Sequence, residues 1–122
     1  MLNQTLLIGR IVEEPELRET GTGKKVTNVR IAVPRPYKNE NGVYEADFVD
    51  CVMWNNKAER ASEYHKTGDL VLITARIHTY IDKDHKKQVE IVAEDISFLS
   101  KSKKAIEQEI LQDDFEPEIE ME

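Results

Sequence analysis

The sequence predicts an all-β domain, a small five-stranded Greek-key barrel with one helix between its third and fourth strands. Three observations indicate this fold. Strand-like segments separated by turn signals fill the first hundred residues. The spacing of apolar residues becomes helical only once, from residue 55 to about 66. Strand character then returns for two further segments, and no internal repeat is present.

The first three strands are predicted from alternation and from the turns between them. Thr5–Val12 is the first strand, and Gly9 within it indicates a bulge or a sharp bend. A hairpin turn at 21–23 leads into Val26–Val33, which we expect Pro34 and Pro36 to end, because proline cannot donate to a strand ladder. A second turn at 39–42 precedes the third strand, Ala46–Trp54.

The helix and the last two strands complete the predicted order. We expect Asn55 to cap a helix that runs to about Lys66, with Gly68 as its C-terminal stop. Ala58, Ala61 and His65 recur there at i, i+3 and i+7, the spacing of one helix face. For the histidines, His65, His78 and His85, we expect surface or DNA-facing roles. The fourth strand is Asp69–Tyr80, and a polar turn at 82–87 precedes the last strand, Gln88–Leu99. This order of elements is that of the OB-fold, and the position of the helix disfavours an SH3-like or other small barrel.

Composition excludes several classes of protein. The chain has 122 residues with 17 Lys and Arg against 24 Asp and Glu, a net charge of -7. Its longest apolar runs, at 6–8 and 70–73, are far shorter than the roughly 20 residues that span a bilayer. The N-terminus lacks the basic and apolar regions of a secretory signal, so we expect a cytoplasmic protein. One cysteine and three scattered histidines predict neither a disulfide nor a zinc site.

The acidic charge is concentrated at the C-terminal end. From Glu107 onward there are eight acids and no base, whereas residues 1–106 hold 16 acids and 17 bases, a net charge of +1. We therefore expect a domain at 1–100, followed by a short linker and a disordered acidic tail at 101–122. The tail serves either for interaction or only for solubility.

Alternation in the third strand predicts two different faces. Phe48, Asp50, Val52 and Trp54 point one way, and the small apolar set Val49, Cys51 and Met53 points into the barrel. In the fourth strand the apolar face comprises Val71, Ile73, Ala75 and Ile77, and the opposite face comprises Thr74, Arg76, His78 and Tyr80. Arg30 has outward parity in the second strand, and Arg35 and Tyr37 lie just beyond its expected end.

Outward aromatic rings among basic groups indicate binding of single-stranded nucleic acid. Exposed bases stack on aromatic rings, while Lys and Arg follow the phosphates. The alternative interpretation places Phe48 and Trp54 in the core or in a subunit interface. No nucleotide-binding, metalloprotease, CxxC or serine-hydrolase motif is present, and the carboxylates at 13–16 and 45–47 lack a supporting histidine. We therefore predict no enzyme, no catalytic residue, no cofactor and no metal.

Several stretches together resemble the bacterial single-stranded DNA-binding proteins, in the versions found in low-GC Gram-positive bacteria and their phages. The stretches are Leu2-Asn3, Leu7-Ile8-Gly9-Arg10, Pro15-Glu16-Leu17-Arg18, Ile31–Tyr37, Ala46–Trp54, Ala58-Glu59, Lys66–Asp69, Ala93-Glu94 and Phe98-Leu99. The resemblance covers residues 1–100. It implies an OB-fold that assembles as a homotetramer and binds DNA without sequence preference in replication, recombination and repair.

The resemblance also implies roles for individual residues. The base-stacking aromatics fall on Tyr37, Phe48 and Trp54, and Tyr80 lies near the position of a further one. Arg18 matches a phosphate contact, but His78 and Tyr80 replace a usual arginine pair, so that Arg76, Lys86 and Lys87 would have to compensate. The full predicted DNA-binding set is Arg10, Arg18, Arg30, Arg35, Tyr37, Phe48, Trp54, Arg76, His78 and Tyr80.

The tail departs from the family pattern. Asp113, Asp114 and Phe115 imitate the partner-binding end of family tails, but here the chain continues to Glu122. We expect the tail to compete electrostatically with DNA for the basic groove, and to recruit replication or repair proteins other than the usual partners of the family, or none. Two other hypotheses remain at this point: an OB-fold protein-interaction module with DNA binding secondary, and an RNA-binding or restart-primosome-like protein, because stacking platforms accept either sugar.

Overall fold

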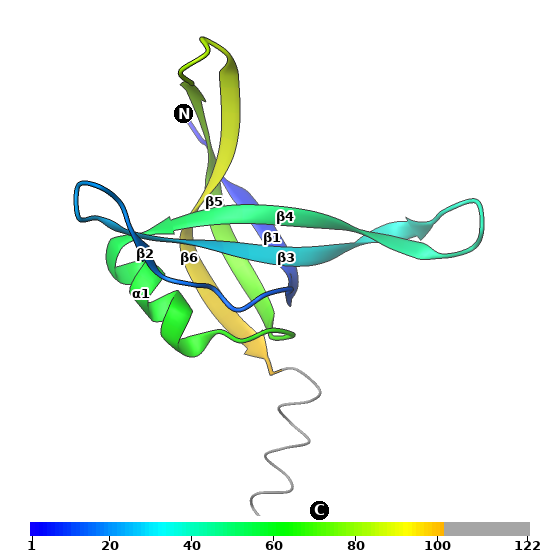
Figure 1. The fold of residues 1–122 in the computed structure, drawn as a ribbon. Helices are drawn as coiled ribbons and strands as arrows, with labels where there is room; N and C mark the ends of the chain where they lie inside the picture. Colours follow the sequence, from blue (N-terminus) through cyan, green and yellow to red (C-terminus); the bar gives the residue numbers. More distant parts are fainter. Residues whose placement is uncertain (102–122) are drawn as a thin grey trace, which may run out of the picture.

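Five long strands close into a barrel in the computed structural model, which describes residues 1–101 (Figure 1). The elements are β1 (Thr5–Ile11), β2 (Arg18–Glu19), β3 (Lys25–Lys38), β4 (Tyr44–Trp54), α1 (Asn55–Tyr64), β5 (Leu70–Ile81) and β6 (Lys87–Ser100). The sheet order is β1-β5-β6-β4-β3-β2, and a further β1–β3 pairing closes the barrel. All pairs are antiparallel except β4–β6. The predicted OB-fold is confirmed, with its helix between the third and fourth long strands.

The two-residue strand β2 is the one strand that the sequence did not predict. It pairs with the start of β3, Arg18 opposite Val26 and Glu19 opposite Lys25, across the predicted turn at 21–23. Two residues are too few to show an alternating pattern, so pairing alone identifies this strand.

Gly9 lies where β1 passes from one neighbour to the other. Residues 5–10 of β1 pair with β5 without a register shift, and Arg10 and Ile11 also pair with β3. A Cβ atom on Gly9 would lie 2.5 Å from the Ala32 carbonyl oxygen. The glycine therefore permits a close approach of two backbones at the closure, and β1 contains no bulge.

The prediction that Pro34 and Pro36 end their strand is wrong. β3 continues to Lys38, and its pairing with β4 becomes irregular between Pro34 and Lys38. Beyond Ala32 no pairing of β3 with β1 is recorded, and the β3–β4 hairpin projects away from the barrel (Figure 1). A proline on such an open edge removes no ladder bond, which is why the strand tolerates both.

Both predicted helix boundaries also need correction. Trp54, not Asn55, is the N-cap residue, no side chain caps the helix, and Asn55 has a φ of 59°. The helix ends at Tyr64, and His65 is already extended. Gly68, with a φ of 91°, lies in a following turn, where its amide donates to the Ile11 carbonyl at 2.7 Å. It joins this turn to the end of β1.

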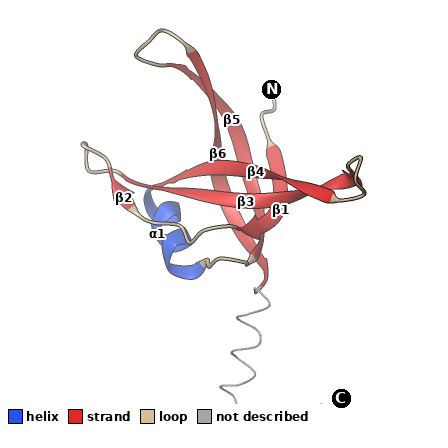
Figure 2. Cartoon of the chain, turned by 45° about the vertical axis from the view of Figure 1, so that its right-hand side comes forward, coloured by secondary structure: helices blue, strands red, loops and turns tan. Residues whose placement is uncertain are grey.

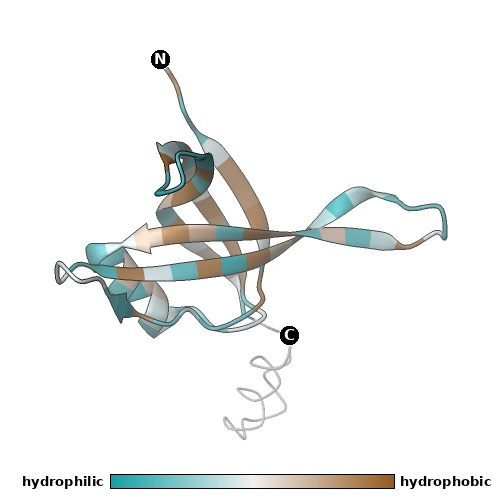
Figure 3. Cartoon of the chain, turned by 45° about the horizontal axis from the view of Figure 1, so that its top comes forward, coloured by the Kyte–Doolittle hydropathy of each residue, from teal (hydrophilic) through white to brown (hydrophobic). Residues whose placement is uncertain are grey.

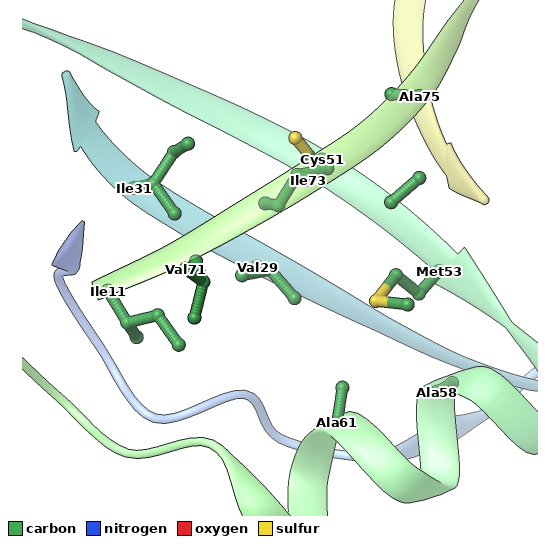
Figure 4. Packing of buried hydrophobic residues seen from close by; sticks show 11 residues of the cluster. Ile11, Val29, Ile31, Cys51, Met53, Ala58, Ala61, Val71, Ile73 and Ala75 are labelled. Carbon is green, nitrogen blue, oxygen red and sulfur yellow. The ribbon is translucent and has the colours of Figure 1, made fainter. Parts of the chain in front are cut away.

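The core lies between the strands and α1, which covers one end of the barrel (Figures 2 and 4). Most of the predicted inward residues are buried, namely Cys51, Met53, Val71, Ile73 and Ala75, while Val49 is partly buried and packs against this core. The helix adds Ala58 and Ala61. His65 is also buried, so the expectation of a surface or DNA-facing role is wrong for this histidine: it follows the last helical residue, where the chain turns back toward the barrel. Burial, aided by the neighbouring Asp50, raises the pKa of Cys51 to about 11, so its thiol stays protonated.

Ile77 is the exception among the predicted core residues, because 46% of its surface is exposed. The pairing of β5 with β1 ends at Ala75, so Ile77 lies beyond it, toward the tip of the β5–β6 hairpin. This hairpin extends past the barrel (Figure 1). The tips of this hairpin and of the β3–β4 hairpin are mostly hydrophilic (Figure 3). Side chains continue to alternate between the two sides of a strand where it extends past the barrel interior. The position of Ile77 in this alternation therefore could not predict whether it is buried.

Candidate nucleic-acid interface

The outward side of β4 carries the predicted aromatics. Phe48 is 65% exposed and Trp54 is 37% exposed, so neither is a core residue of the described chain. In the register with β3, Ala32 lies opposite Phe48, Arg30 opposite Asp50 and Val26 opposite Trp54. Side chains directly opposite each other share a face, so Arg30 lies between the two aromatic positions.

This face continues across the barrel onto β6 and β5. Register places Asn28, Val52, Val92 and Arg76 in one row over β3, β4, β6 and β5. His78 and Tyr80 follow Arg76 on the same side of β5, and their rings stack with centroids 5.9 Å apart. We call this surface the aromatic face; its predicted site residues are Arg30, Phe48, Trp54, Arg76, His78 and Tyr80.

Arg18 lies beside the aromatic face. It lines a hollow of about 430 Å³ with Arg30, Asp50 and Asn28, and the hollow's other wall carries Glu13, Glu14 and Glu16. The fold thus brings together two predicted phosphate contacts that are twelve positions apart in sequence. It also surrounds them with carboxylates.

A second hollow, of about 460 Å³, lies at Trp54. The β2–β3 turn provides Thr20, Thr22 and Lys24, and Asn55 completes the lining. Lys24 is a cation beside the indole that sequence reasoning missed, because only the pairing of β2 with β3 brings this turn toward the end of β4.

The two remaining predicted arginines differ in position. Arg10 on β1 lies opposite Ala32, which in turn lies opposite Phe48, so it shares the outer side of the sheet with the aromatic face; its Nη1 donates to the Gly68 carbonyl at 2.9 Å. Arg35 binds Asp47, which has the parity of Val49 and Cys51 and so lies on the side of β4 opposite Phe48. Alternation in β3 gives Arg35 the parity of Ile31 and Val33 rather than that of Arg30, so it could have been separated from the aromatic face if β3 had been predicted to continue past Pro34.

The β3–β4 hairpin carries further exposed aromatic rings. Tyr37 is largely exposed, as predicted. Tyr44 is equally exposed and had not been predicted; the ammonium group of Lys38 lies 5.6 Å from the centroid of its ring. The signal for this pair was the turn at 39–42, which places Lys38 opposite Tyr44.

Carboxylates pair with most of the arginines of the interface. Arg30 donates to Asp50 through Nε and Nη2 at 2.6 and 3.1 Å, and this bond lowers the pKa of Asp50. Arg35 contacts Asp47 and Glu45 at 2.8 and 2.9 Å. Hydrogen bonds to Asp50 and Asp47 raise the pKa values of Arg30 and Arg35, respectively. The Arg76 and Glu94 side chains are 3.9 Å apart.

Other predicted features lie outside the aromatic face or outside the described residues. The tail residues Asp113, Asp114 and Phe115 fall beyond residue 101, where the structure describes nothing. Within residues 1–101, no group of three or more His, Cys, Asp or Glu side chains is placed to hold a metal ion. None of the helices described there is long and apolar enough to cross a membrane.

Comparisons with known proteins agree with the predicted resemblance. The chain is 42% identical over 103 residues to a single-stranded DNA-binding protein of Halalkalibacterium halodurans, covering 81% of this chain and 61% of that relative. Single-stranded DNA-binding protein 2 of Listeria monocytogenes is 37% identical over 111 residues, covering 88% and 69%. The chain thus spans about three-fifths of the length of the first of these relatives.

A solved structure and a family model extend these comparisons. The crystal structure of the wild-type single-stranded DNA binding protein from Thermus aquaticus superposes with a TM-score of 0.69 at 24% identity, covering 81% of this chain and 50% of that one. This structural similarity supports the assignment of the fold only. The model of the single-strand binding protein family matches residues 2–99. With a match over nearly the whole barrel, the chain belongs to the single-strand binding protein family.

Proposed function

We propose that this protein binds single-stranded DNA without sequence preference, as a non-enzymatic participant in replication, recombination and repair in the cytoplasm. The observation that carries the proposal is the aromatic face, where exposed rings and arginines share one surface over four strands. Bases would stack on Phe48 and Trp54, with Tyr37 and Tyr80 extending the path. Arg18, Arg30 and Arg76 would contact the phosphates.

The lone Trp54 provides the test. Oligo(dT) should quench its fluorescence, because a base stacked on the exposed indole replaces water there. A duplex of the same length should quench weakly, since its bases are already stacked. Binding should weaken as salt rises, with a slope near -0.7 per phosphate contacted. Absence of both quenching and binding would overturn the proposal, and stronger binding of oligo(U) than of oligo(dT) would redirect it to RNA.

We further propose that the chain self-associates, as a homotetramer, through the outer surface of β1. Leu6 and Ile8 are 63% and 52% exposed there, and register places Ile8 beside Leu72 of β5. Exposed apolar side chains in neighbouring positions are typical of contact surfaces. Light scattering of the eluted protein should give a mass of four chains. Ile8→Glu should lower the mass, whereas Val43→Glu, at an equally exposed position near the tip of the β3–β4 hairpin, should not. A wild-type protein that elutes as a monomer would refute this.

The acidic tail would serve a separate role, in partner recruitment and in competition with DNA. Eight acids follow Lys104 without a balancing base, against a net charge of +1 for residues 1–106. Removal of residues 107–122 should tighten DNA binding at low salt, where electrostatic attraction is least screened. An unchanged affinity for DNA after this deletion would refute the proposed competition between the tail and DNA. Loss of replication or repair proteins from a pull-down with an Asp113→Asn, Asp114→Asn, Phe115→Ala variant would support recruitment.

A further inference from the structure

The arginine at the centre of the aromatic face is already bound by a carboxylate. Arg30 and Asp50 lie directly opposite each other on β3 and β4. Two nitrogens of the guanidinium, Nε and Nη2, donate to the two different oxygens of the carboxylate, at 2.6 and 3.1 Å. The third, Nη1, lies 3.7 Å from an oxygen of Glu13. All three guanidinium nitrogens therefore face carboxylate oxygens.

A DNA phosphate would bind the same guanidinium nitrogens of Arg30. Guanidinium binds carboxylate and phosphate through the same two-pronged geometry, with parallel N–H groups directed at two oxygens. About half of the Arg30 and Asp50 side-chain surface is accessible, so solvent and a DNA strand can reach the pair from outside. An exposed ion pair is weak, and it can open when a competing anion arrives.

We propose that Asp50 is an internal competitor for the DNA phosphate at Arg30, occupying the guanidinium until a strand displaces it. This rests on the proposed function, in which Arg30 contacts the strand. The competition lowers affinity and favours release of the strand. It also flattens the salt dependence, because a phosphate that replaces Asp50 at Arg30 leaves a free carboxylate that recruits a cation from solution.

A related arrangement is found on the neighbouring stretch of β3, although there Nε and Nη2 converge on a single carboxylate oxygen, Oδ1 of Asp47. The guanidinium of Arg35 donates to Asp47 through Nε and Nη2, and to Glu45 through Nη1. Both acids come from β4, the strand that also provides Asp50. Cross-strand carboxylates thus accompany both arginines of β3, whereas Lys24 beside Trp54 has no carboxylate among the residues that line its hollow. Aromatic stacking therefore has a larger share of the binding than the number of arginines suggests.

A double-mutant cycle on the full chain tests the proposal. Asp50→Asn should tighten oligo(dT) binding up to about fivefold at low salt, the upper range for an exposed ion pair. The slope of log affinity against log salt should become steeper by about 0.7, equivalent to one further phosphate. In an Arg30→Gln background, Asp50→Asn should change affinity less than about twofold, because no guanidinium remains to be released.

A matched control separates this effect from a general change of charge. Glu63→Gln removes the same charge from an exposed position on α1, and we expect less than about a twofold effect on DNA affinity. Far-ultraviolet circular dichroism and the thermal midpoint verify that each variant folds. The pair is exposed, so neither measurement should change much.

Three results would overturn the proposal. Weaker binding by Asp50→Asn would make this residue a positioning residue that holds Arg30 for the strand. Equal tightening in the Arg30 and Arg30→Gln backgrounds would indicate long-range repulsion between Asp50 and the DNA. No change in affinity or slope would mean that Arg30 does not meet the strand. The last result would also remove Arg30 from the proposed phosphate contacts. None of the three overturns the binding of single-stranded DNA itself, which fails only if the wild-type protein does not bind oligo(dT).

Discussion

Phe48→Ala separates the proposed role of this ring in DNA binding from its contribution to stability. Phe48 is 65% exposed, so only about one-third of its surface is buried by the fold. Full burial of a phenylalanine contributes about 1.5–3 kcal/mol, and the variant should therefore lose only about 0.5–1 kcal/mol of unfolding free energy. A base stacked on the ring contributes about 1–3 kcal/mol, which corresponds to a loss of affinity of about 5- to 150-fold.

Two measurements on the same preparation check this prediction. Urea unfolding gives the free energy of unfolding, and quenching of Trp54 fluorescence by oligo(dT) gives the affinity. The matched control is Phe98→Ala, since Phe98 is 47% exposed but lines a separate hollow between α1 and β6. Phe98→Ala should leave the affinity within about twofold of wild type, because the proposed path of the bases does not include this ring. If Phe48→Ala binds as tightly as wild type, or if both variants lose affinity equally, the stacking argument fails.

Three further predictions concern the barrel itself. Met53→Ala should lower the free energy of unfolding by about 2–5 kcal/mol, measured by urea titration, because it leaves a cavity at a fully buried position. Gly9→Ala should lower it by about 1–3 kcal/mol in the same assay, since its Cβ would meet the Ala32 carbonyl oxygen at 2.5 Å; an unchanged value would show that β1 can move away from β3. Burial lowers the pKa of His65, with Asp69 opposing the shift, so the unfolded chain takes up this proton first as the pH falls below about 6.5. The thermal midpoint should therefore drop between pH 7 and 5, and His65→Gln should flatten that part of the profile; an equally steep profile in the variant would assign the drop to other groups.

The local periodicity of the sequence predicted most of the elements correctly. Strands, turns and the helix are determined by patterns within ten to fifteen residues, and these patterns predicted the outward parity of Phe48 and Trp54. The same parity rule was wrong for Ile77, and the proline rule was wrong for Pro34 and Pro36. Both errors have one cause: two hairpins extend past the barrel, where inside and outside no longer differ and strand edges are open.

The residue types and their alternation alone determined a small β-barrel with aromatic and basic side chains on its outer surface. Only the tertiary structure decided which of the predicted arginines share a surface with the aromatics and which carboxylates they meet. Arg30 and Asp50 are twenty positions apart and become neighbours through the β3–β4 register, while Arg18 joins them through the two-residue strand β2. The physical reason is that alternation reports the side of a strand within that strand, whereas the partner of a charge depends on register between strands.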